Sequence, residues 1–225
     1  MPLSRSTAAL VVILAGSGMA GAQDRTACSG IYCPQTKAAD YAAEFAPYVA
    51  AGKSWEDVKG QNVLVMKYYN PDGTIAATKT WPQTGYMQPV ASLPGKIAFA
   101  GQGTPTIALY GLSPCTKKGS FNFKGEKFTC QTLWQDRLSD NLYGTQAVIC
   151  RAYADQIDKP VQQATCIREN EGFGARSLKG GVVIDDALVG LGIAAIDRDA
   201  TGKLLRPDLA KAETQGTAIF KSVTN

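Results

Sequence analysis

Six cysteines, all beyond residue 22, constrain the fold of this chain more than any other feature of its sequence. An even number of cysteines favours disulfides when a chain is exported, although six of them leave several pairings open. Pairs that are adjacent in the sequence close the shortest loops, so we expect the bonds Cys28–Cys33, Cys115–Cys130 and Cys150–Cys166. A cysteine metal site is the alternative, but the chain contains neither a CxxC pair nor a histidine.

The N-terminal residues indicate export. Arg5 precedes the apolar run Ala8–Ala15, and Ala20-Gly21-Ala22 provides the small-residue pattern of a signal-peptide cleavage site. We therefore expect a signal peptide over residues 1–22 and a periplasmic or secreted protein. A membrane-spanning helix needs roughly 20 apolar residues, and neither this run nor any later one is that long, so we expect no membrane span.

The composition narrows the classes of function. Hydrophobic residues make up 45% and charged residues 19% of the chain, which is typical of a globular protein. The absence of histidine excludes Ser-His-Asp and Cys-His triads, histidine-ligated zinc and haem sites, and the most common general base. The net charge of +4 is too small to indicate nucleic-acid binding by itself.

The chain beyond residue 22 divides into two predicted parts. Residues 23–90 form a small α+β unit, with a helix from about Thr36 and two strands, 63–69 and 74–81, around the turn Asn70-Pro71-Asp72-Gly73. A proline-containing stretch at 82–94 marks the boundary, and residues 91–225 form the second part.

The second part contains alternating strand-like and helix-like segments. We expect strands at 97–100, 106–110, 147–151 and 162–167, and helices at 129–142, 185–195 and 208–221. The pair Asp185-Asp186 is expected to mark a helix start, where negative charge complements the helix dipole. Cys150 and Cys166 fall on neighbouring strands, so their bond is expected to join the two. This pattern suits a small barrel with packed helices.

Several of these segments, taken in order, resemble staphylococcal-nuclease-like (thermonuclease) domains. The resemblance runs from about Leu93 to Val223 and depends on the following pieces: IALYGLSP at 107–114, the cysteine-bearing strands at 148–151 and 164–166, DALVGLGIA at 186–194, and a closing helix at 212–220. It implies an OB-type five-stranded β-barrel with three helices, preceded by the small α+β unit.

The resemblance fails at the catalytic positions. In the family, carboxylates hold a divalent cation and arginines stabilise the phosphodiester transition state. Here these positions fall on Lys96, Ala108, Ser113, Cys115 and Val161, and each change removes the required charge. The resemblance therefore implies a pseudo-nuclease: an exported, non-catalytic binding or structural module of the cell envelope, with no catalytic residue and no cofactor. A divergent calcium-dependent nuclease with a rearranged site is the alternative.

A second motif has partial calcium-loop spacing. Oxygen-bearing side chains at Asp197, Asp199, Thr201 and Asp208 occupy loop positions 1, 3, 5 and 12, with Gly202 at position 6. An ordinary surface loop is the favoured interpretation, because the last ligand is an aspartate instead of a glutamate and a proline lies inside the loop.

A third motif lies between Cys115 and Cys130. Four lysines alternate with three phenylalanines there, and cations with exposed rings can hold a polyanion such as single-stranded nucleic acid. The favoured interpretation is a disulfide-closed hairpin with its phenylalanines packed inward and its lysines solvated. We expect the partner to be another envelope protein or a polyanion; the residues concerned are Lys117, Lys118, Lys124, Lys127, Phe121, Phe123 and Phe128.

Overall fold

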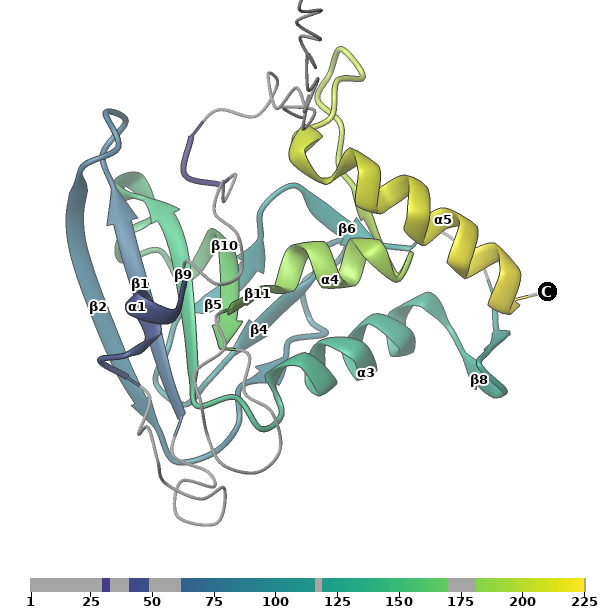
Figure 1. Cartoon of the computed structure of the whole chain (residues 1–225), viewed down its shortest axis with the longest axis horizontal. Coiled ribbons are helices and arrows are strands. Elements are labelled where there is room, and N and C mark those ends of the chain that lie inside the picture. The colour runs from purple at the N-terminus through teal and green to yellow at the C-terminus, as the bar shows by residue number, and fades with distance from the viewer. Residues whose placement is uncertain (1–29, 33–40, 49–61, 116–118, 170–180, 225) are drawn as a thin grey trace, which may run out of the picture.

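The computed structural model describes residues 30–32, 41–48, 62–115, 119–169 and 181–224. These residues form an α+β fold around one mixed sheet of eight strands, with helices α3, α4 and α5 packed beside it (Figure 1). The strand order is β2-β1-β9-β10-β5-β4-β3, and β11 pairs with β10. The main strands are β1 (Asn62–Tyr69), β2 (Ile75–Gln83), β3 (Gln88–Pro89), β4 (Ala98–Ala100), β5 (Thr106–Leu109), β9 (Ala147–Tyr153), β10 (Val161–Glu169) and β11 (Gly181–Val183).

The hairpin β1–β2 belongs to the same sheet as the second half of the chain. Its turn is the predicted one: Asp72 Oδ1 accepts a hydrogen bond from the Thr74 amide at 2.9 Å, and Gly73 has a φ of +85°. Strand β1 then pairs in parallel with β9, from Val63 opposite Ala147 to Tyr69 opposite Tyr153. The predicted boundary after residue 90 therefore falls between β3 and β4, which are two strands of this sheet.

Two predicted disulfides are confirmed. Cys150 and Cys166 lie directly opposite each other on the antiparallel strands β9 and β10, and their bond joins these neighbours. The Cys115–Cys130 bond encloses the hairpin of β7 (Phe121–Phe123) and β8 (Glu126–Phe128). The expected Cys28–Cys33 bond lies outside the described residues.

The helices agree with the sequence in type and differ at their ends. Helix α3 (Cys130–Leu142) begins at the N-cap Thr129, as predicted. Helix α4 (Ile184–Gly190) ends before the predicted Ala195, because Gly192 adopts a φ of +74°. The chain then continues as β12 (Ala194–Ile196), which pairs with β6 (Leu112–Pro114). Helix α5 (Ala210–Thr224) begins after a 3₁₀ turn, Pro207–Leu209, rather than at Asp208. A second 3₁₀ turn, Ala154–Gln156, follows β9.

The sheet has an apolar core on each face. The larger core packs one face against α3 and α4 and includes Leu64, Trp134 and Leu188. The smaller core lies on the other face, where the short helix α1 (Ala42–Phe45) lies across β1 and β9 (Figure 1). Tyr41, just before α1, and Phe45, its last residue, are both buried in this core. The predicted helix from about Thr36 falls largely outside the described residues. Trp81 packs against the larger core, and Trp55 lies outside the described residues.

Candidate functional site

The turn after β5 brings together the segments that carry the predicted site. Gly111 has a φ of +68°, and a side chain there would place its Cβ 3.0 Å from Arg206 Cγ. The Gly111 carbonyl accepts a hydrogen bond from the Asp197 amide at 2.8 Å. Only glycine combines this conformation with so close a neighbour. The turn therefore joins the region of Lys96 and Ser113 to a segment far along the chain, residues 197–206.

None of the five positions that the nuclease-like resemblance assigns to catalysis is a carboxylate or an arginine. Lys96 forms an ion pair with Asp197, with 3.3 Å between Nζ and Oδ2. Ala108 is buried in β5, Ser113 lies on β6 opposite Ala195, and Cys115 is held in its disulfide. Val161 begins β10 and is partly exposed. Metal-assisted phosphodiester hydrolysis requires carboxylates at such positions, and these side chains cannot replace them.

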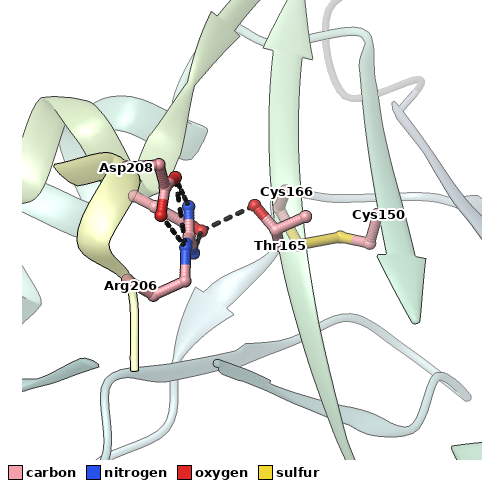
Figure 2. A network of polar contacts seen from close by, with 6 residues as sticks. Cys150, Thr165, Cys166, Arg206 and Asp208 are labelled. Carbon is pink, nitrogen blue, oxygen red and sulfur yellow. Dashed lines mark hydrogen bonds and ion pairs between the residues drawn. A yellow bond between two sulfur atoms is a disulfide. The ribbon is translucent and has the colours of Figure 1, made fainter. Parts of the chain in front are cut away.

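A buried ion-pair network lies beside this turn (Figure 2). The Arg206 guanidinium donates from Nη1 to Asp185 Oδ2 at 2.5 Å and from Nη2 to Asp208 Oδ2 at 2.9 Å. Its Nε donates to Asp208 Oδ1 at 3.0 Å, and the Thr165 hydroxyl donates to Asp185 Oδ2 at 2.7 Å. The side chains of Arg206 and Asp185 are both 0% exposed. Thr165 and Cys166 are consecutive on β10, so the network and the disulfide extend from opposite faces of that strand.

The single positive charge of Arg206 lies between two carboxylates and opposes the effect of burial on Asp185. Burial raises the pKa of Asp185, and the charge of Arg206 offsets part of that effect. Burial also raises the pKa of Asp186, and the carboxylates of Asp185 and Asp208 raise it further. Burial alone lowers the pKa of Arg206, but its two carboxylate partners outweigh burial and raise it. The arrangement is an internal salt bridge in which the guanidinium lies between the carboxylates of Asp185 and Asp208.

Asp185 and Asp186 lie in the first turn of α4, as predicted, but Asp185 is also part of the buried network. Asp185 is buried with Ile184, Leu188 and Val189, so it lies on the apolar face of α4. The spacing of these residues, three and four apart, is the sequence signal that could have identified it. The sequence contains no comparable signal for Arg206. It precedes Pro207 in a polar segment, and nothing near it in the chain indicates that its side chain is buried against Asp185. Asp185 Oδ1 has no hydrogen-bond partner among the described residues.

The side chains that the partial calcium loop would use as ligands form hydrogen bonds or ion pairs with other protein groups or with each other. Asp199 Oδ1 accepts hydrogen bonds from the Thr201 amide, the Thr201 hydroxyl and the Lys203 amide at 2.8, 2.6 and 3.0 Å. Asp197 pairs with Lys96, and Asp208 binds Arg206. A strand, β12, precedes the loop instead of a helix. Across the part of the chain that the structure describes, no group of three or more His, Cys, Asp or Glu side chains could hold a metal ion.

The lysine-rich hairpin has the packing that we favoured. Phe121 and Phe123 are buried and contact Phe220 of α5, with ring centroids 5.2 and 6.0 Å apart. Lys124 and Lys127 are exposed. Lys117 and Lys118 lie outside the described residues. Phe121 and Phe123 are therefore packed inside the protein and Phe128 is half-buried, whereas Lys124 and Lys127 face solvent.

No protein-family model matches the chain, and no curated protein matches its sequence. Within the described residues, none of the helices combines the length and the apolar character needed to cross a membrane.

Proposed function

We propose that this chain is an exported, non-catalytic binding module of the cell envelope and a degenerate relative of staphylococcal-nuclease-like domains. The charges around Gly111 are the main support. Two protein cations, Lys96 and Arg206, lie near the turn that corresponds to the family's metal-binding strand end, and each is paired with a carboxylate. A divalent cation would have to displace one of these built-in positive charges before it could bind.

The course of the sheet also supports the proposed relationship. Gln83, at the end of edge strand β2, forms two hydrogen bonds with Gln102 in the turn between β4 and β5. The Gln102 backbone amide donates to Gln83 Oε1 at 2.6 Å, and Gln83 Nε2 donates to the Gln102 carbonyl at 3.3 Å. Strands from distant positions in the sheet order therefore meet, as they do in a curled sheet. We interpret the fold as an OB-type barrel that is held open by insertion of the β1–β2 hairpin beside β9.

Export is supported by two disulfides, a bond type that persists in oxidising compartments. N-terminal sequencing of the protein recovered from the envelope or medium tests this part of the proposal. We expect the mature chain to begin at Gln23. A protein that retains Met1 and stays in the cytoplasm would contradict it.

The absence of catalysis is tested with the disulfide-bonded protein, calcium and labelled single- and double-stranded DNA. We expect no cleavage above that of a buffer control. The variant Asp197→Asn is the matched control, because it removes the carboxylate closest to Lys96. Cleavage that requires calcium in the original protein and disappears in this variant would refute the proposal and favour a rearranged nuclease site. Equal cleavage by both proteins would identify a contaminating nuclease.

A further inference from the structure

The buried network fastens the C-terminal part of the chain to the sheet. Arg206 lies in the segment that leads into α5, and its guanidinium binds Asp185 of α4, which in turn accepts a hydrogen bond from Thr165 of β10. Asp208 binds the same guanidinium, and Asp186 lies beside Asp185 at the exposed side of α4. We call Asp185, Asp186, Arg206 and Asp208 the latch.

The latch carries more negative than positive charge. Three carboxylates accompany one guanidinium, and Asp185 Oδ1 is buried without a hydrogen-bond partner among the described residues. The charged groups that act on this carboxylate pair are Arg206 and Asp208. Helices α3 and α5 and strands β10, β11 and β12 also pack against α4, and within the described part of the chain they add no further charge to it. Uptake of a proton would therefore bring the latch closer to neutrality.

Few other groups in this chain can take up a proton near neutral pH. Histidine is the side chain whose ordinary pKa lies between pH 5 and 8, and the chain contains none. Burial raises the pKa of Asp185, although Arg206 offsets part of that effect. Burial and the neighbouring carboxylates raise the pKa of Asp186. A pKa that is higher in the folded state adds stability at low pH, and this stability is lost as the pH rises through the folded-state pKa.

We propose that the latch is a pH-sensitive switch, which takes up one proton as the pH falls from 7 to 5 and then holds α5 more firmly against α4 and β10. Asp185 and Asp186 interact, so the proton belongs to the pair rather than to one residue. Carboxylates with a lowered pKa act in the opposite direction, but only near and below their ordinary pKa of about 4. The inference concerns the stability of the fold and does not rest on the proposed function.

Urea denaturation of the disulfide-bonded protein at pH 5 and at pH 7 measures the switch. Uptake of one proton over two pH units can change the equilibrium constant of unfolding by at most about 100-fold. Because the titration is spread over this interval, we expect the constant to be about tenfold smaller at pH 5 than at pH 7. A constant that is equal at both pH values, or larger at pH 5, would overturn the inference.

A pair of double variants assigns the effect to the latch. Asp185→Asn/Asp186→Asn removes the titrating carboxylates and leaves the pair of Arg206 with Asp208, so the constant should change by less than about twofold between the two pH values. Asp136→Asn/Asp140→Asn is the matched control, because these two aspartates of α3 share the exposed-side partner Arg137. This control should keep the tenfold change. A change that survives in the first variant would refute the assignment.

A measurement on the unaltered protein keeps the inference testable if the first variant fails to fold. Carbon-13 NMR of the aspartate carboxyl groups should show the resonance of Asp185 or Asp186 titrating between pH 5 and 7. Hydrogen exchange of α5, corrected for the intrinsic effect of pH, should be slower at pH 5 relative to the β1–β2 hairpin. If neither carboxyl titrates in this interval, or if α5 gains no protection, the latch is not a switch.

Discussion

The strongest test of the structure is the substitution Arg206→Met. Methionine keeps an unbranched apolar side chain at this position and removes the guanidinium. Asp185 would keep the hydrogen bond from Thr165 but would lose the cation that balances its charge. A buried carboxylate without a counter-charge is costly, because neither water nor protein compensates for its desolvation.

The expected loss of stability is large. Because the side chains of Arg206 and Asp185 are both 0% exposed, water does not replace the lost partner. Removing one member of such a pair typically costs about 3–5 kcal/mol in the free energy of unfolding. The loss should shrink at acid pH, because burial raises the pKa of Asp185 and, without Arg206, the folded protein takes up a proton more readily than the unfolded chain. Adding Asp185→Asn should restore part of the stability, with a coupling energy of about 1–3 kcal/mol.

Urea denaturation followed by tryptophan fluorescence provides the assay, because Trp134 is buried in the larger core. Arg198→Met is the matched control: Arg198 is exposed on the same loop and donates only to the Gly202 carbonyl. Its loss should stay within about 0.5 kcal/mol. An Arg206→Met protein that loses no more than the Arg198→Met protein, or that gains nothing from Asp185→Asn, would refute the argument that this ion pair is buried and isolated from water.

Three further predictions concern packing and charge. Gly216→Ala should lower the free energy of unfolding by about 1–3 kcal/mol in the same assay, because a Cβ there would lie 2.0 Å from the Val189 carbonyl oxygen; an unchanged midpoint would contradict this contact. Asp186→Asn should raise the melting temperature at neutral pH, because the fold raises the pKa of Asp186 and so disfavours its charged form. The gain should disappear below about pH 4, where the aspartate becomes protonated in both the folded and the unfolded state. A variant with a lower melting temperature at neutral pH would contradict this sign. Replacing Cys150 and Cys166 with alanine should cost about 3 kcal/mol by calorimetry, given their separation of 16 residues; a negligible loss would show that the bond does not constrain the unfolded chain.

Features with local causes were predictable from the sequence. The turn at Asn70–Gly73, the cap at Thr129 and the pairing of Cys150 with Cys166 depend on residues that are close in the chain or on strands that follow one another. The inward packing of Phe121 and Phe123 also followed from the short loop that a disulfide closes.

Features that depend on distant partners were not predictable. Strand β1 reads as half of an isolated hairpin, and no local pattern shows that its other edge pairs with β9. Lys96 and Asp197 are 101 residues apart, so their ion pair has no signature in either segment. For Asp185 the local rule identified the helix start but not the burial of the side chain, because burial depends on the whole fold. Lys67 and Arg151, which lie opposite each other and share Glu44, were likewise inconspicuous, since each is the single charged residue of its strand.

The parallel pairing of β1 with β9 determines when the fold can be completed. The parallel partner of residues 62–69 is made only when residues 147–153 leave the ribosome, so the hairpin has an unpaired edge while the chain between β2 and β9 is synthesised. Such long-range pairing slows folding and leaves a surface that other chains can join. Truncation anywhere before β9 should therefore yield aggregates instead of a smaller domain, because the β1 edge would stay unpaired.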